Sequence, residues 1–479
     1  MNGKSILSKI SILYLLLPFV IFVIGWTKLY IAIPVALVLV ATIILIFKEK
    51  EVFDSYKIKC NSEQISKILI IVGICALWVY FSGIGKFVFQ NQDHTVRNTI
   101  FETLVNNKWP VISDEGRTLT YYIGFWLPSA LVGKIAGVRA GFCFQALWAL
   151  MGILLVYGLL CVRRKKLAIW PLVVMVFFGG LDILGSYMMG WSHGIGGKIP
   201  LEWWSDPYQF TSITSQLFWV FNQSIPAWIS TLLVIESKSN KYLVFILGIS
   251  LLNSTLPSIG LMVIILYKMF AKKYKVNSKK EWMTSFAKDT FTMPNILAGG
   301  CTGVISALYL FANDAGTEVK KVEELSALKQ PNLTKYLVFI LFELGAFIII
   351  LGFYYKKRRL YYVLFGWLLL CPIIRVGTAH DFCMRASIPA LFIVMLLMID
   401  TISRAYKEKR TTLFALSIIV LAIGSLTPID EMRRTLTNTY NYINQYEDNY
   451  IKEVSEETLM NGVNFSGSNQ TFFYRNIAK

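Results

Sequence analysis

An acid, an imidazole and an arginine lie within five residues in Asp93-His94-Thr95-Val96-Arg97, directly after a long apolar run. In a helix that begins near Asp93, the carboxylate and Arg97 lie four residues apart and can pair. Such a carboxylate can take a proton from a hydroxyl group, with His94 as a neighbour or substitute. The pattern predicts Asp93 and His94 as catalytic residues and Arg97 as a binding residue. The alternative is that Asp93 only caps the helix, which leaves the histidine and the arginine unexplained.

A second charged stretch, RVGTAHDFCMR, places Arg375 and Arg385 on either side of His380 and Asp381. A guanidinium group has a planar set of donors that matches the oxygens of a phosphate. We therefore predict that these four residues help to bind a phosphate-bearing substrate. Anchoring of the chain at a membrane interface by the two arginines is the other interpretation.

The region between residues 182 and 228 combines aromatic rings with carboxylate and amide groups. It contains FFGGLDILG, a Trp191-Ser-His193 triplet, LEWWSDPYQF and FWVFNQSIPAW. Sugars stack their C–H faces on aromatic rings and exchange hydrogen bonds with carboxylates and amides. An interfacial aromatic belt would account for the tryptophans but not for the amides. The predicted substrate-binding residues here are Asp182, His193, Glu202, Gln209, Asn222 and Gln223.

The elements that must position these residues are apolar helices. Of the 479 residues 55% are hydrophobic, and the mean hydropathy is +0.54. These values are typical of an all-α, polytopic integral membrane protein. A carboxylate inside such a run, as at Glu343, forms either a cavity wall or an interhelical hydrogen bond. The thirteen predicted spans are residues 10–26, 30–47, 66–86, 141–162, 168–187, 216–236, 241–256, 257–270, 292–312, 335–355, 360–375, 385–402 and 411–427.

The net charge of +18 comes from short basic clusters between apolar runs, which is typical of cytoplasmic loops and not of nucleic-acid binding. All six dense clusters fall on one side of the predicted topology. The N-terminus is then cytoplasmic, and the C-terminus and all three histidines are extracytoplasmic. Counting residues 118–138 as a further span would move Arg163-Arg-Lys-Lys166 outside, so we predict that this segment is re-entrant or interfacial.

Three regions follow from this topology. Residues 1–60 form an N-terminal transmembrane hairpin whose first span is not cleaved, because no small-residue cleavage site follows it. Residues 61–427 form the transmembrane core with its outer loops. Residues 428–479 form an extracytoplasmic tail that is too short for a substantial core of its own. The seven cysteines show no framework spacing and are expected to pack as small apolar residues.

Together these features resemble the GT-C superfamily of membrane glycosyltransferases, in which an acid and interfacial helices occupy the first large outer loop. The segments QDHTVRN, YYIGFWLPSALVGK, GLDILG, LEWWSDPYQF, LFWVFNQSIPAW and AHDFCMRASIPAL also resemble bacterial membrane proteins linked to cell-surface polysaccharides. The resemblance implies a polyprenyl-phosphate-linked sugar donor, a glycan or lipid acceptor and a location in the bacterial plasma membrane. In this resemblance, Asp93 corresponds to the acidic residue of the family's first large outer loop. The chain departs from the family because this acid follows the third predicted span and no large C-terminal domain is present.

The expected activity is therefore sugar transfer, with Asp93 as the base and Arg385, helped by Arg375 or Arg97, at the phosphate. A polymerase or ligase of lipid-linked oligosaccharides and a transporter of a lipid-linked glycan are the alternatives. No cofactor is expected. Three histidines and two aspartates could also bind manganese or zinc, although their spacing matches no metal motif.

Overall fold

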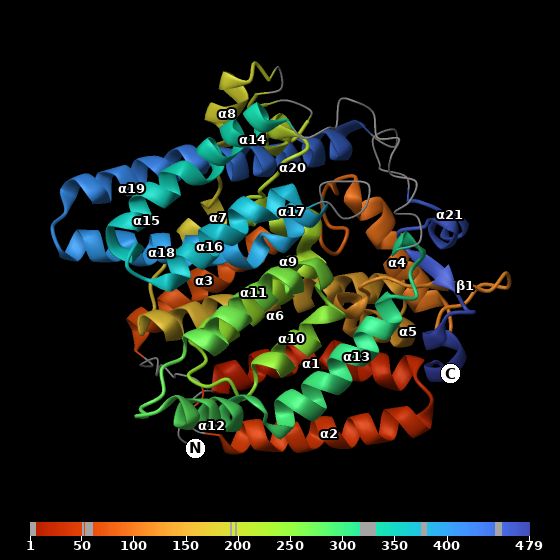
Figure 1. The fold of residues 1–479 in the computed structure, drawn as a ribbon. Helices are drawn as coiled ribbons and strands as arrows, with labels where there is room; N and C mark the ends of the chain where they lie inside the picture. Colours follow the sequence, from red (N-terminus) through yellow and green to blue (C-terminus); the bar gives the residue numbers. More distant parts are fainter. Residues whose placement is uncertain are drawn as a thin grey trace.

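The computed structural model describes residues 6–49, 52, 61–191, 194–196, 199–316, 332–374, 381–445 and 453–479. Within these residues the fold is all-α, apart from one two-stranded antiparallel sheet. Most of the long helices run across the view of Figure 1. The longer helices are α1 (Ile6–Trp26), α2 (Leu29–Lys48), α3 (Ser62–Phe81), α4 (Asp93–Asn106), α6 (Val138–Arg164), α9 (Ile213–Glu236), α11 (Thr255–Ala271), α18 (Ile388–Lys407), α19 (Thr411–Gly424) and α20 (Leu426–Gln445).

The shorter elements connect and interrupt these helices. Three pairs of segments, α7–α8, α14–α15 and α12–α13, are separated by a break or a π-helical turn. The shorter elements used below are β1 (Arg117–Leu119), α5 (Leu127–Ala136), α7 (Trp170–Phe177), α8 (Asp182–Met188), η2 (Leu201–Ser205), α10 (Leu243–Leu251), α12 (Lys279–Thr290), η3 (Pro294–Ala298), α13 (Gly299–Leu310), α14 (Leu333–Ile340), η7 (Leu341–Gly345), α15 (Ala346–Tyr355), α16 (Arg359–Leu370), α17 (Asp381–Ala386) and β2 (Ser466–Ser468).

The described residues contain nine helices that are long and apolar enough to cross a membrane, or ten if the bent pair α12 and α13 counts as one span. This confirms a multi-pass membrane protein, whereas the full set of thirteen predicted spans is not confirmed. The three predicted spans outside this group correspond to α10, α11 and α16. At 1.5 Å per residue the nine residues of α10 rise only about 14 Å, half of a hydrocarbon core of about 30 Å.

Residues 118–138, predicted to be re-entrant or interfacial, contain no helix of spanning length. The segment begins in β1, passes through a short 3-10 turn and ends in the ten-residue helix α5. Pro128 stands at the start of α5, where its missing N–H costs no hydrogen bond. The packed α5–α6 pair then places this segment against the core of the bundle.

Helices α9 and α18 form the centre of the bundle. Both are more than four-fifths buried along their most apolar stretch, whereas α2, α3 and the α19–α20 pair are less than one-third buried. Many exposed side chains of α2 and α3 are apolar, as expected for surfaces that face lipid. Helix α9 packs against α6, α11 and α18, which places it at the centre of the bundle.

Charged contacts tie the basic clusters together at one end of the bundle, called the basic end below. Arg163 at the end of α6 pairs with Glu236 at the end of α9, and with Asp400 of α18 at 2.7 Å. Lys268 near the end of α11 donates to the carbonyl of Ile235 at 2.5 Å. The same end holds the Lys241–Glu49 pair beside α2 and the Tyr354–Glu408 hydrogen bond between the ends of α15 and α18.

The opposite end of the bundle, called the site end below, carries the segment between α3 and α6 and the C-terminal segment. The tail strand β2 pairs with β1, and the backbone N–H of Lys28 donates to the carbonyl of Ile477 at 2.9 Å. Figure 1 shows α4, α5, β1 and the C-terminus together on the side away from α12. The 24 residues of α9 rise about 36 Å between the two ends, which is enough to cross a membrane.

This arrangement predicts that the basic end and the site end lie on opposite sides of the membrane. In a background with Cys143 replaced by serine, Lys357→Cys at the basic end and Gln470→Cys at the site end should react from opposite sides of sealed vesicles. Both residues are exposed, so a charged thiol reagent can reach them. The measurement is labelling of each variant before and after permeabilisation. Labelling of both cysteines from the same side would contradict the two-ended arrangement.

Candidate functional site

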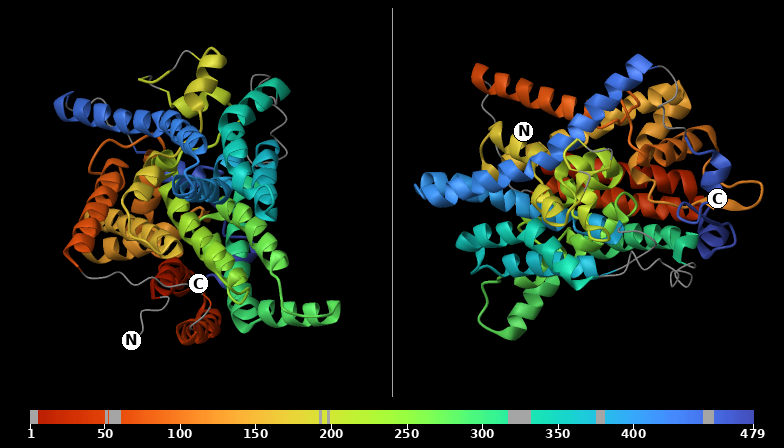
Figure 2. Two further views of the ribbon diagram at one scale, coloured as in Figure 1. Left: turned by 90° about the vertical axis from the view of Figure 1, so that its left-hand side faces the viewer. Right: turned by 90° about the horizontal axis from the view of Figure 1, so that it is seen from above.

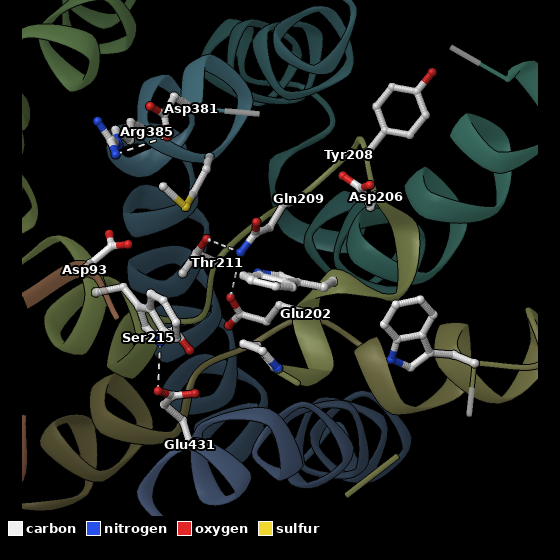
Figure 3. A pocket seen from close by; sticks show the side chains of 15 residues that line it. Asp93, Glu202, Asp206, Tyr208, Gln209, Thr211, Ser215, Asp381, Arg385 and Glu431 are labelled. Atoms are coloured by element: carbon white, nitrogen blue, oxygen red, sulfur yellow. Dashed lines mark hydrogen bonds and ion pairs between the residues drawn. The ribbon is translucent and has the colours of Figure 1, made fainter. Parts of the chain in front are cut away.

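A cavity of about 510 Å³ lies at the site end, where segments distant in the sequence meet (Figure 3). Its size is typical of a small-molecule site. It is bordered by the start of α4, the loop between α8 and α9, the first turns of α9, helix α17 and one residue of α20. The lining residues are Asp93, Trp191, Pro200, Glu202, Trp203, Asp206, Tyr208, Gln209, Thr211, Ser215, Trp219, Asp381, Met384, Arg385 and Glu431.

Asp93 stands at the first residue of α4 and is fixed from two directions. Its carboxylate accepts a hydrogen bond from Nη2 of Arg97 at 2.6 Å, one helical turn later. The side chain of Asn91 accepts from the Asp93 backbone N–H and donates to the carbonyl of Phe218, which joins the start of α4 to α9. The side chain of Asp93 is 37% exposed and that of Arg97 only 6%. The predicted helix with its four-residue pair is thus present, and Asp93 is the member that reaches the cavity.

Arg385 lies on α17 and reaches the same cavity from the other side. Its guanidinium pairs with Asp381 at 3.0 Å and donates to the hydroxyl of Tyr122. Burial opposes its charge, but the combined attraction of Tyr122, Asp381, Tyr121 and Asp93 raises its pKa above the usual value. Nε of Arg385 is buried and has no hydrogen-bond partner among the described residues. A permanent positive charge with an unused donor therefore lies beside the cavity.

The wall opposite Arg385 is aromatic and polar. Glu202 in η2 accepts a hydrogen bond from the Ser212 backbone N–H at 2.9 Å and another from the Gln209 side chain at 3.2 Å. Trp203 and Trp219 lie with their ring centroids 6.3 Å apart. Figure 3 shows Gln209 between Glu202 and Thr211, on the side of the cavity facing Arg385. The predicted sugar-binding pair of Glu202 and Gln209 is thus assembled in one wall.

Asp182 lies behind this wall and does not line the cavity. It accepts hydrogen bonds from the indole N–H of Trp204 at 3.0 Å and from the Thr427 hydroxyl at 2.8 Å. Its side chain also hydrogen-bonds to Glu343, which stands in the π-helical turn η7. Gly180 makes this possible, because a Cβ there would come within 1.9 Å of the Glu343 carboxylate. Two carboxyl groups in contact need a shared proton, so this pair is a buried proton site.

Three predicted residues are buried elsewhere. The His94 ring lies against Phe221 at 5.6 Å, with Nδ1 3.2 Å from the Asn91 side-chain oxygen, and burial followed by the charge of Arg97 lowers its pKa. His94 is therefore a neutral residue beneath Asp93 and not a lining residue. Asn222 and Gln223 are fully buried in α9, and their side-chain atoms have no hydrogen-bond partner among the described residues.

The kink in α9 explains why the two amides miss the cavity. In a regular helix Asn222 would share a face with Ser215 and Trp219, which both line the cavity. Val220 has φ −136° and ψ 36°, outside the helical region, and the helix direction changes there. Residues after Val220 consequently point into the bundle. The predicted residues His193, Arg375 and His380 lie outside the described residues.

Sequence reasoning missed two residues that shape the site. Tyr122 holds Arg385 from a segment predicted only as interfacial. Glu431 lines the cavity from the predicted tail, accepts a hydrogen bond from the Trp219 indole at 2.7 Å and pairs with Arg434 at 3.1 Å. The spacing of Glu431 and Arg434 on a helix was a visible signal for this pair, whereas the role of Tyr122 had no sequence signal.

No metal site is formed by the described residues, because no three of their His, Cys, Asp or Glu side chains are arranged to hold an ion. Comparison of the chain with protein-family models, with curated proteins and with solved structures finds no match.

The buried carboxyl group of Glu202 predicts that the free energy of unfolding depends on pH. Burial, and then the neighbouring Asp182, raise its pKa to about 8. The unfolded chain releases this proton near pH 4.3, so the folded protein binds one more proton between about pH 5 and 8. Its free energy of unfolding should fall across that window, by at most about 1.4 kcal/mol per pH unit from this group. Thermal unfolding of the detergent-solubilised protein from pH 5 to 9 measures the slope.

Glu202→Gln serves as the comparison, because it keeps the shape and can keep the hydrogen bond from the Ser212 backbone N–H but cannot titrate. Its unfolding temperature should depend less on pH between 5 and 8 than that of the unsubstituted protein. Parallel profiles for the two proteins would show that Glu202 is ionised in the folded state.

Proposed function

We propose that this protein transfers a sugar from a polyprenyl-phosphate-linked donor to a glycan or lipid acceptor at the extracytoplasmic face of a bacterial cell membrane. Basic residues concentrate in cytoplasmic loops, so the basic end is assigned to the cytoplasm. The cavity at the site end then opens at the other face of the membrane.

The observation that carries the proposal is that Asp93 and Arg385 line the same cavity although they are almost 300 residues apart in the sequence. A carboxylate and a guanidinium that line one cavity are the two groups that sugar transfer from a phosphate needs. One takes up the proton of the acceptor hydroxyl, and the other stabilises the charge on the departing phosphate. Figure 3 shows both groups bordering the space between α4 and α17.

In the proposed reaction the acceptor oxygen attacks the anomeric carbon of the donor sugar. The bond from that carbon to the phosphate oxygen breaks, and its electron pair leaves with the phosphate. Asp93 takes the acceptor proton, while Arg97 holds the carboxylate in position. The guanidinium of Arg385 stabilises the phosphate at the moment when negative charge develops.

The opposite wall supplies groups for the sugar itself. The rings of Trp203 and Trp219 can cover a C–H face, and the carboxyl of Glu202 and the amide of Gln209 can exchange hydrogen bonds with ring hydroxyls. A volume of about 510 Å³ accommodates a sugar phosphate and an acceptor sugar but not a polyprenyl chain. The chain of the donor would therefore remain in the lipid.

Transport of a lipid-linked glycan is the second candidate, and the Asp182–Glu343 pair favours it. The pair lies at the break between α7 and α8 and at a π-helical turn, inside two candidate spans. Buried carboxyl groups at broken helices are typical of proton-coupled transporters. The two proposals differ in chemistry, because only a transferase forms a covalent product.

The decisive experiment compares Asp93→Asn and Arg385→Ala with the unsubstituted protein in cells that depend on the gene for a surface glycan. Loss of the base should lower sugar transfer about 10²- to 10⁴-fold, and loss of the arginine should have an effect of similar size. Mass spectrometry of the glycan measures the added sugar, and immunoblotting measures the amount of protein in the membrane.

Asp314→Asn is the matched control. Asp314 pairs with Arg117 at 2.6 Å but does not line the cavity, so this variant removes a similar ion pair elsewhere at the site end. Its glycan should be unchanged. If Asp93→Asn and Arg385→Ala enter the membrane normally and the glycan keeps its added sugar, the catalytic assignment fails. Export of an unmodified lipid-linked glycan would instead support transport.

A further inference from the structure

A second cavity, of about 250 Å³, lies at the basic end, far from the site already described. It is formed by the end of α9 and the loop that follows, by the last turns of α11 and by the start of α16. Its wall contains both lysines and aliphatic side chains. The lining residues are Ile235, Ser237, Lys238, Asn240, Ile264, Tyr267, Lys268, Ala271, Lys272 and Leu360.

Three lysines give this cavity its positive charge. Lys268 donates one hydrogen bond to the carbonyl of Ile235, and Lys272 pairs with Asp289, each at 2.5 Å. An ammonium group has three donors, so both retain donors for a ligand. The nearby acids already have partners, because Glu236 pairs with Arg163 and Asp289 also binds Ser239, Tyr274 and the Asn240 backbone.

Asn240 adds an acceptor to the same cavity. Its side chain is fully buried, and Nδ2 donates to the Thr290 hydroxyl at 3.2 Å. Its Oδ1 has no hydrogen-bond partner among the described residues. A buried carbonyl oxygen without a partner is costly, and a ligand hydroxyl would satisfy it. The cavity thus combines donors for an anion with an acceptor for a hydroxyl group.

The surroundings of the cavity suit the edge of a membrane. Helix α12 lies across the end of the bundle, visible as the green helix that extends sideways at the bottom of the left view in Figure 2. Trp282 and Phe286 of α12 stack on one another, and Phe286 stacks on Phe270 of α11. Phe270 and Met283 are each more than half exposed, and α12 also carries lysines, the pattern of an interfacial helix.

We propose that this cavity binds the headgroup of an anionic phospholipid of the phosphatidylglycerol type. The phosphodiester lies against Lys268 and Lys272, a headgroup hydroxyl donates to Oδ1 of Asn240, and an acyl chain runs along Ile264 and Leu360. Basic pockets between membrane helices recognise anionic headgroups in this way. The proposal is independent of sugar transfer, because none of these residues lines the other cavity.

Native mass spectrometry of the purified full-length chain tests the proposal. The protein is incubated with equal amounts of phosphatidylglycerol and phosphatidylcholine, and the ratio of the two bound lipids is measured. Phosphatidylglycerol should be retained preferentially by the unsubstituted protein. Each lysine removed in Lys268→Gln/Lys272→Gln should lower that preference about fivefold.

Lys356→Gln/Lys357→Gln is the matched control, because it removes two exposed lysines at the same end but outside the cavity. It should keep the preference. If the cavity variant does not fold, Leu360→Trp fills the apolar wall without a change in charge and should lower retention of both lipids. Equal retention of the two lipids by the unsubstituted protein, an equal loss in the control, or displacement of the lipid by inorganic phosphate would overturn the proposal.

Discussion

The buried guanidinium of Arg385 is the constraint on which the site end depends. A charge removed from water is destabilising by several kcal/mol unless acceptors surround it. Here the acceptors are the Tyr122 hydroxyl and the Asp381 carboxylate, from segments more than 250 residues apart. The hydrogen bond to Tyr122 and the ion pair with Asp381 therefore hold the segment around Tyr122 against α17. Because α17 leads directly into the central helix α18, the wall of the cavity is tied to the most buried part of the bundle.

The other charged groups around the cavity follow the same rule. Asp93 is paired with Arg97, Asp381 with Arg385 and Glu431 with Arg434, each within one helical turn. Both members of each pair lie on the same helix, so each carboxylate is neutralised within its own helix. Glu202 differs because hydrogen bonds and a proton, not a neighbouring cation, accommodate its carboxyl group.

This distinction also explains what the sequence could predict. The pairs Asp93–Arg97 and Asp381–Arg385 are visible as four-residue spacings, and the long apolar runs predict the spanning helices by length. Tyr122 and Glu431 could not be assigned, because nothing local shows that they meet Arg385 and Trp219. Asn222 and Gln223 were predicted to bind substrate because amide groups beside aromatic rings suit a sugar. The non-helical residue Val220 turns them away, and Pro226 in the same helix is the sequence feature that is typical of such a kink.

The charge of the cavity needs an explanation if its substrate is a phosphate. Five carboxyl groups and one arginine line it, which at first sight repels an anion. Three of the five are neutralised by arginines, two of them through Arg97 and Arg434, which stand just behind the wall. Protonation of Glu202 removes a further negative charge at neutral pH. Arg385 is the one cation among the described lining residues, whereas the wall across from it presents amide, carboxyl and indole groups. Arg385 and the uncharged polar and aromatic groups lie on opposite walls, and under the proposed function this separation would direct the phosphate of a sugar phosphate toward α17 and its ring toward η2.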